Sequence, residues 1–222
     1  MGRLRVAGNV AINLTLLEED AGLPLDFINQ YGRGAGPSEE GVAPRTPGAT
    51  NRWAATPVVQ IYRGLVGSGK EIVTDARLDA MRGSILSLFG PLTGNVLGLP
   101  PIEVRSGSAP TRLAQVPRGR LVIVQRADAQ FSSEHIGSVS NGADITKTII
   151  ACSVDSTIEF FNRMFAHSLG GYVVSSSTES ILNPAGRATP SDRDALAATF
   201  MYSRTAGNLA PDQDPSGVFF NA

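Results

Sequence analysis

The chain has 222 residues, of which 42% are hydrophobic, and its formal net charge at pH 7 is −1. This length is enough for one large domain or two small ones, with sufficient apolar side chains to fill a core. The near-zero charge gives no basic surface field, so nucleic acid is excluded as an expected partner. No segment approaches the ~20 apolar residues of a membrane-spanning helix, and residues 6–17 are too short and too polar for a secretory signal.

The cysteine content also limits the kinds of fold and site that the chain can form. The only cysteine, Cys152, cannot form a disulfide within the chain and offers no set of thiolate ligands for a metal. We therefore expect Cys152 to behave as a small, buried apolar side chain.

Residues 1–52 are interpreted as an N-terminal extension. Within it, residues 6–27 are expected to form a strand and a short helix, and residues 26–31 to dock onto the main body. Residues 32–52 are rich in glycine and proline and poor in large apolar side chains, which predicts a loop or linker. The main domain is therefore expected to span residues 53–222.

The first part of the main domain contains a strand, a helix and further strands. Residues 56–62 are rich in β-branched and aromatic side chains, which predicts a strand. Residues 74–88 carry apolar side chains at helical spacing, with Thr74 as N-cap and Asp75 in the first turn; these apolar residues are Leu78, Met81, Ile85 and Leu88. Residues 102–105, 121–124 and 145–152 predict three more strands. The pattern indicates an α+β or mixed α/β domain.

Two more helices are expected near the end of the chain. Ser156 and Glu159 have the spacing of a capping box, which would open a helix whose last turn contains His167 and Ser168. On this helix one face is expected to carry Phe160, Met164, His167, Ser168 and Gly171. The final helix is expected to start at residues 189–192 with Pro190 in the first helical position. Its apolar side chains would pack on the core; they are Leu196, Ala197, Phe200 and Met201.

The spacing of a phosphate-binding loop occurs in Gly64-Leu65-Val66-Gly67-Ser68-Gly69-Lys70, which follows the first strand. Glu71 occupies the position that should hold a serine or threonine for magnesium. Because its carboxylate would repel phosphate, a flexible turn is the preferred interpretation.

The most informative segment is Ala166-His167-Ser168-Leu169-Gly170-Gly171, which fits two catalytic patterns. One is the serine-hydrolase motif Ala-x-Ser-x-Gly, with Ser168 as nucleophile. The other is a zinc-peptidase helix with the motif His-Glu-x-x-His, in which Ser168 replaces the glutamate and Gly171 the second histidine.

Residues 53–202 resemble the catalytic domain of a metzincin-type zinc peptidase, a family with a zincin-like fold. The helix with His167 lies where that family has His-Glu-x-x-His-x-x-Gly-x-x-His. Ser180-Ile181-Leu182-Asn183-Pro184 is similar to the Ser-Ile-Met-x-Pro turn beneath the metal, and residues 190–202 resemble the closing helix. The resemblance implies an α+β zincin-like domain with a mixed sheet, an active-site helix and a C-terminal helix.

The zinc ligands that the resemblance implies are largely missing. His167 matches the first ligand, but Ser168 stands in place of the general base, Gly171 in place of the second ligand, and Ser177 near the third. Catalytic zinc needs three protein ligands plus water. We therefore expect no metal, no cofactor and no metallopeptidase mechanism.

A serine nucleophile needs a base within hydrogen-bond reach, and His135 and His167 are the histidines of the chain. His135 is preferred because His167 adjoins Ser168 on the same helix. Glu134, Asp144 and Glu179 are alternative orienting carboxylates. The α/β-hydrolase fold is excluded, because its histidine follows the serine in the chain.

The sequence thus predicts a serine-type, esterase- or lipase-like hydrolase of small carboxylic esters or lipids on a zincin-like scaffold without zinc. Its site would comprise Ser168, His135 and His167. The alternative is an inactive pseudo-metallopeptidase that acts as a binding domain. The resemblance to a largely exported family implies an extracellular or periplasmic location, and the oligomeric state is left open.

Overall fold

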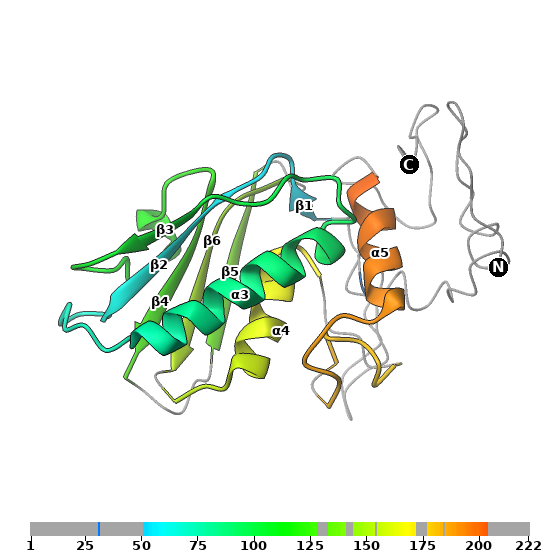
Figure 1. The fold of residues 1–222 in the computed structure, drawn as a ribbon. Helices are drawn as coiled ribbons and strands as arrows, with labels where there is room; N and C mark the ends of the chain where they lie inside the picture. Colours follow the sequence, from blue (N-terminus) through cyan, green and yellow to red (C-terminus); the bar gives the residue numbers. More distant parts are fainter. Residues whose placement is uncertain are drawn as a thin grey trace, which may run out of the picture.

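The computed structural model describes Tyr31 and residues 51–127, 133–140, 144–153, 155–171, 177–183 and 185–203, with residues 133–140 described by their backbone alone. They form a mixed α/β arrangement (Figure 1). Its strands are β1 (Arg52–Trp53), β2 (Val58–Leu65), β3 (Ile102–Arg105), β4 (Arg120–Arg126), β5 (Ser133–Ser140) and β6 (Asp144–Ser153). Its helices are α3 (Asp75–Leu92), the 3-10 helix η1 (Leu113–Gln115), α4 (Ile158–Ser168) and α5 (Asp192–Ser203).

The sheet is mostly parallel. Its order is β1-β6-β4-β2-β3, and each of these neighbouring pairs is parallel, whereas β5 pairs antiparallel with β6. The predicted strands at 56–62, 102–105, 121–124 and 145–152 are confirmed as β2, β3, β4 and β6. The sequence did not predict β1 or β5. The mixed α/β fold class is thus confirmed.

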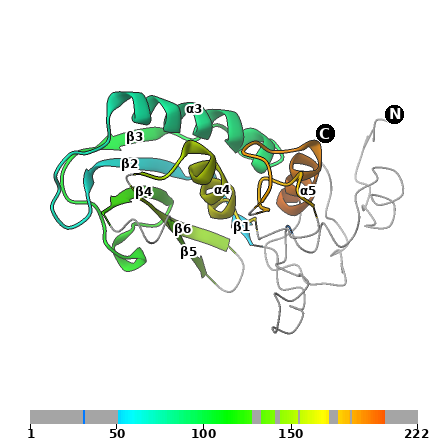
Figure 2. The same cartoon turned by 90° about the horizontal axis from the view of Figure 1, so that it is seen from below.

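One face of the sheet carries the main core, and alternation along the strands decides which residues face it. Leu121 and Ile123 of β4 pack there with α3, and the predicted apolar positions of α3 are all buried. The alternate residues Val122 and Val124 face a smaller apolar cluster on the opposite side. Figure 2 shows α3 along one side of the sheet and the green segment around η1 on the other.

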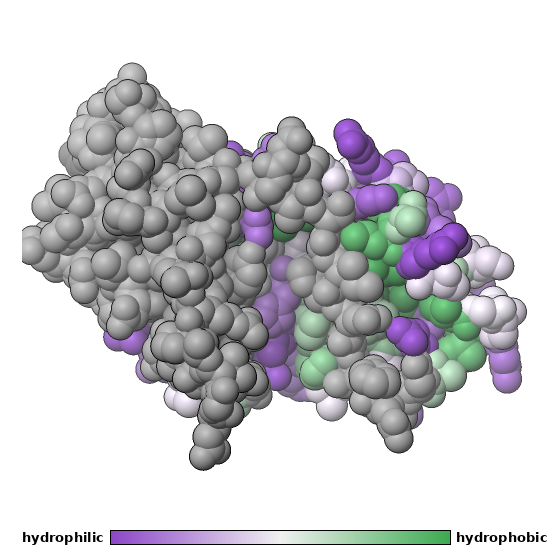
Figure 3. Space-filling model, turned by 180° about the vertical axis from the view of Figure 1, so that it is seen from behind, coloured by the Kyte–Doolittle hydropathy of each residue, from purple (hydrophilic) through white to green (hydrophobic). Residues whose placement is uncertain are grey.

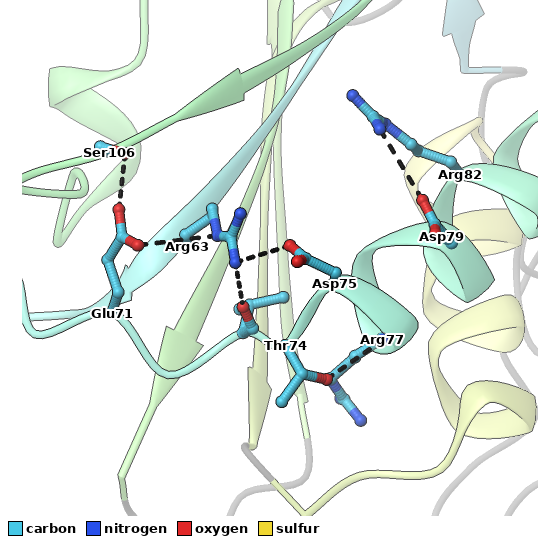
Figure 4. A network of polar contacts seen from close by, with 9 residues as sticks. Arg63, Glu71, Thr74, Asp75, Arg77, Asp79, Arg82 and Ser106 are labelled. Atoms are coloured by element: carbon cyan, nitrogen blue, oxygen red, sulfur yellow. Dashed lines mark hydrogen bonds and ion pairs between the residues drawn. The ribbon is translucent and has the colours of Figure 1, made fainter.

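The β2–α3 junction contains a turn at residues 66–68. Gly64 and Glu71 form an antiparallel bridge, and Gly67 and Gly69 have positive φ. Glu71 accepts from Ser106 Oγ at 2.6 Å and lies 3.8 Å from the Arg63 guanidinium. The same guanidinium contacts Asp75 at 2.9 Å (Figure 4). Glu71 therefore has partners within the protein.

Thr74 is the N-cap of α3, as predicted, because its hydroxyl accepts from Arg77 N at 3.2 Å. The capping box predicted for α4 is wrong by one residue. Thr157 is the N-cap and accepts from Phe160 N. The Ser156 hydroxyl instead accepts from the Arg77 guanidinium at 3.0 Å, which ties the starts of α3 and α4 together.

The start of α5 also differs from its prediction. Ser191, and not Pro190, adjoins the helix, and its hydroxyl accepts from Asp194 N while its own N–H and hydroxyl donate to Asp194 Oδ2. This exchange satisfies amide groups that a helix start leaves unpaired. Ala197, Phe200 and Met201 are buried as expected, and Leu196 is partly buried.

Tyr31, which precedes the main domain, contributes to its core. Tyr31 is 1% exposed and belongs to the main apolar cluster, as expected for the end of the segment 26–31, whose other residues lie outside the described ones. Burial raises the pKa of Tyr31 well above its usual value, and the charge of Asp194 adds to this effect. Of the linker predicted for residues 32–52, only Asn51 and Arg52 belong to the described residues.

In the described part of the chain, no helix has both the length and the apolar character needed to cross a bilayer.

Candidate functional site at the end of helix α4

Ser168 lies in the interior of the protein. Its side chain has no exposed surface, and its hydroxyl donates to Phe165 O at 2.6 Å. The face predicted for Ser168 is therefore wrong, because it shares the buried side of α4 with Phe161 and Phe165. In this position the hydroxyl cannot contact an ester, which gives no support to its role as a nucleophile.

The carbonyl groups at the end of α4 are bound by side chains from distant parts of the chain. The Trp53 indole Nε1 donates to Ser168 O at 2.9 Å, and the Tyr202 hydroxyl donates to Leu169 O at 2.7 Å. The last carbonyls of a helix have no partners within the helix. Trp53 and Tyr202 satisfy two of them inside the core, where both side chains are 2% exposed.

Gly170 allows the chain to leave α4 at this point. Its φ is +104°, and a Cβ atom there would lie 2.1 Å from Asn51 O. Both the backbone conformation and the close approach of Asn51 require glycine. Gly170 is therefore explained by the packing of the helix end.

His167 is half-buried, and its Nδ1 lies 2.9 Å from Gly171 O. Because a carbonyl oxygen can only accept, Nδ1 carries the hydrogen, and in the neutral ring Nε2 has the lone pair. Burial lowers the pKa of His167; the hydrogen bond to Gly171 opposes this effect, and the charge of Arg163 adds to it. Burial thus favours the neutral ring, and the hydrogen bond to Gly171 O fixes its orientation.

The other predicted site residues are not brought to Ser168 by any contact among the described residues. His135 and Glu134 belong to β5, where they pair with Ile150 and Ala151 of β6, and their side chains lie outside the description. Asp144 is half-buried at the start of β6, and Glu179 is exposed. The base and the orienting carboxylate proposed for Ser168 therefore stay predictions.

A stripe of half-buried side chains runs along α4, formed by Phe160, Arg163, Met164 and His167. This α4 stripe has the i, i+3, i+4, i+7 spacing of one helix face. The sequence interpretation included Phe160, Met164 and His167 but missed Arg163. The helical spacing could have identified Arg163, because it lies three residues after Phe160 and four before His167.

The turn at residues 180–183 lies against the α4 stripe. Arg163 Nε donates to Ile181 O at 3.3 Å. The turn is held from its other side by Asp194, which is fully buried and accepts from Ser180 Oγ at 2.5 Å and from Ile181 N at 3.0 Å. Leu182 is also fully buried.

Within the described ranges, no three His, Cys, Asp or Glu side chains lie close enough together to hold a metal ion. Comparison of the chain with models of protein families, with curated proteins and with solved structures found no match.

Proposed function

We propose that this chain is a non-catalytic binding domain with zincin-like architecture, the pseudo-metallopeptidase of the two functions that the sequence allowed. The observation that carries the proposal is the position of Ser168, whose hydroxyl is enclosed and bound to Phe165 O. A nucleophile must reach both its base and the substrate carbon. Ser168 would have to leave the core to do either.

The order and contacts of the elements support a zincin-like architecture. A strand, a helix, further strands and a helix are followed by the turn at 180–183 and by α5, which is the order that the resemblance implies. The turn contacts α4 through Arg163 and contacts α5 through Asp194. A turn held beneath the central helix is what the Ser-Ile-Leu-Asn-Pro motif leads us to expect.

The residue at which α4 ends supports a different alignment of the zinc motif with the chain. In His-Glu-x-x-His the two histidines lie at i and i+4 on one helix face. Because α4 ends at Ser168, Gly171 is outside the helix and cannot complete such a pair with His167. If His167 is instead the second histidine, Arg163 holds the first position and Met164 that of the glutamate. Gly170 then matches the glycine of His-x-x-Gly.

This register leaves a single zinc ligand, as the earlier one did. A guanidinium stays protonated in proteins and has no acceptor, so Arg163 cannot bind a metal ion. Met164 has no acid or base function. The third ligand position falls on Val173, which lies outside the described residues and has an aliphatic side chain. His167 alone does not form a zinc site.

We assign binding to the α4 stripe. Phe160 and Met164 offer apolar surface, and Arg163 keeps its positive charge beside the neutral His167 ring. Charge complementarity favours a partner that presents a carboxylate next to an apolar side chain. Arg163 at the position of a zinc ligand would thus give this surface an anion-binding function in place of the activation of a metal-bound water.

The test is an assay of p-nitrophenyl acetate and butyrate with purified wild-type protein, Ser168→Ala and the exposed-serine control Ser87→Ala, each with chelator and with added zinc. We expect no turnover above the buffer rate in any sample. Chelator-resistant turnover that is lost in Ser168→Ala alone, in a variant with a native circular dichroism spectrum, would establish the serine hydrolase. Turnover that requires zinc would establish a metal enzyme. Either result overturns the proposal.

A further inference from the structure

Strand β3 lies at one edge of the sheet (Figure 1) and, among the described strands, pairs with β2 alone. Its register shows where its backbone groups point. Val59 N donates to Pro101 O, and Val59 is the register partner of Ile102. In a parallel pair a residue bonds to the two neighbours of its partner, so the odd-numbered residues of β3 direct their backbone groups to β2. The N–H and C=O groups of Ile102 and Val104 therefore point away from β2.

The two faces of β3 carry different side chains. Ile102 and Val104 pack against the main core on the α3 side. Glu103 and Arg105 lie on the opposite face, which Figure 3 shows with hydrophilic and hydrophobic residues next to each other. The Arg105 guanidinium lies 2.6 Å from the Glu103 carboxylate, which also accepts from Gln60, and the two charged side chains are 49% and 36% exposed. The outer strand thus presents a negative and a positive charge two residues apart.

A strand with this pattern is complementary to a second copy of itself. If two β3 strands pair antiparallel about a two-fold axis at Val104, the two Val104 residues exchange both backbone hydrogen bonds, because these groups point outward. The next residues form a non-hydrogen-bonded pair, in which Glu103 lies directly opposite Arg105 of the second copy. Opposite charges in this position stabilise a strand pair. The symmetry produces this charge pair twice.

The other symmetric registers of the strand pair are disfavoured by the residues that they bring together. An axis at Glu103 would place the two carboxylates opposite each other, and an axis at Arg105 the two guanidinium groups, and both arrangements are destabilising. An axis at Ile102 would bring Val104 opposite Pro100, which has no N–H to donate. The charges and the proline therefore select the register at Val104.

Exposed apolar side chains flank the same edge. In the described part of the chain, the large hydrophobic residues that are exposed belong to α3 and to the segment between α3 and β3; they are Leu86, Val96 and Leu99, at 48%, 52% and 64%. On α3, Leu86 is about two and a half turns after Arg77, on the opposite side of the helix. Arg77 binds the start of α4, and α4 packs on β6, across the sheet from β3. Leu86 is therefore on the β3 side of α3.

We propose that the chain forms a two-fold symmetric dimer in which two β3 strands pair antiparallel at Val104 and join the sheets of both copies. Hydrogen bonds between the Val104 residues and the charge pairs between Glu103 and Arg105 fix the register. Both α3 helices then lie on the same face of the joined sheet, with their Leu86 sides toward each other. The proposal does not depend on the α4 stripe, because α4 lies over β6 and away from this edge.

The experiment is sedimentation velocity of the full chain. The wild type should change from monomer to dimer with a dissociation constant on the order of 100 μM, because four-residue strands and the flanking leucines form a small interface. Glu103→Arg and Arg105→Glu should each weaken the dimer at least tenfold, and the double variant Glu103→Arg/Arg105→Glu should restore it. The control is Glu179→Arg, which reverses an exposed charge outside the sheet and should dimerise like the wild type.

Val104→Pro tests the backbone hydrogen bonds. It removes an N–H that points away from β2, so it should keep the β2–β3 pair and abolish the dimer. If circular dichroism shows that Glu103→Arg does not fold, because Gln60 loses its acceptor, Arg105→Glu at its exposed position and Val104→Pro carry the test. A chain that is monomeric at every concentration would leave β3 to a strand of another protein and overturn the proposal. A dimer that Arg105→Glu and Val104→Pro leave unchanged would also overturn it.

Discussion

Trp53 and Ser168 are 115 residues apart in the sequence and are joined by a 2.9 Å hydrogen bond from the indole Nε1 to the Ser168 carbonyl oxygen. The bond lies inside the core, and the Tyr202 hydroxyl binds the next carbonyl, that of Leu169. The segment that resembled a nucleophile motif is therefore a place where distant parts of the chain meet. Its hydrogen-bonding groups are used to hold the fold together.

Tyr202→Phe should lower the free energy of unfolding by about 1–3 kcal/mol, because it removes only the hydroxyl and leaves the buried Leu169 carbonyl without this donor. Urea denaturation followed by circular dichroism measures the change. Tyr62→Phe is the control, since Tyr62 is half-buried and its substitution should change stability by less than about 0.5 kcal/mol. Equal effects of the two substitutions would contradict the hydrogen bond.

Asp194→Asn should destabilise the fold by about 2–4 kcal/mol, because charge-assisted hydrogen bonds from Ser180, Ile181 and Ser191 converge on this buried carboxylate. An amide keeps the size but presents donors where only acceptors fit. The control is Asp192→Asn, which makes the same substitution at an exposed position in the same turn of α5. The prediction fails if thermal denaturation gives the same midpoint for both variants.

His167 should make the fold less stable in mild acid. Its pKa is lowered by burial, so as pH falls below about 6.5 the unfolded chain takes up the proton before the folded protein does. The neutral His167 ring makes its full contribution to the free energy of unfolding above about pH 6.5. This contribution decreases as pH falls toward the lower pKa of the folded state.

The measurement is the free energy of unfolding in urea between about pH 5 and 7.5 for the wild type, His167→Gln and His135→Gln. The wild type and His135→Gln should lose stability toward pH 5 by more than His167→Gln does. A pH dependence that His167→Gln leaves unchanged would exclude His167 as its source.

Cys152 should react very slowly with a disulfide reagent in the folded protein. Burial raises the pKa of this thiol to about 12, although the charge of Arg77 acts in the opposite direction, and the side chain has no exposed surface. Both effects keep the reactive thiolate scarce and out of reach. The rate with an aromatic disulfide should rise steeply across the urea transition, and a fast reaction without denaturant would show that Cys152 is accessible.

The sequence predicted the parts of the fold whose patterns are local. The apolar spacing of α3 and the β-branched runs of β2, β4 and β6 were sufficient, because their side chains alone determine which face is buried. β5 was not predicted. Its sequence, Ser-Glu-His-Ile-Gly-Ser-Val-Ser, is mostly polar, and it becomes a strand through pairing with β6.

The candidate site could be predicted only in part for a related reason. The helix that carries His167 and Ser168 was found from its capping and apolar residues. The direction of Ser168 could not be found, because Ser168 is at the edge of the buried face. Contacts from Trp53 and Tyr202, far away in the chain, determine how that end of α4 is packed. The role of Asp194 likewise depends on a turn that precedes it by more than ten residues.

The two side chains that bind the end of α4 also have a consequence for how the protein folds. Trp53 precedes α4 by more than one hundred residues and Tyr202 follows Leu169 by 33, so the Trp53 contact needs the chain as far as Ser168 and the Tyr202 contact needs α5 as well. Contacts between residues this far apart, together with a parallel sheet, are typical of slowly folding proteins. We therefore expect the end of α4 to be fixed in one of the last steps of folding, when the nascent chain already contains α5.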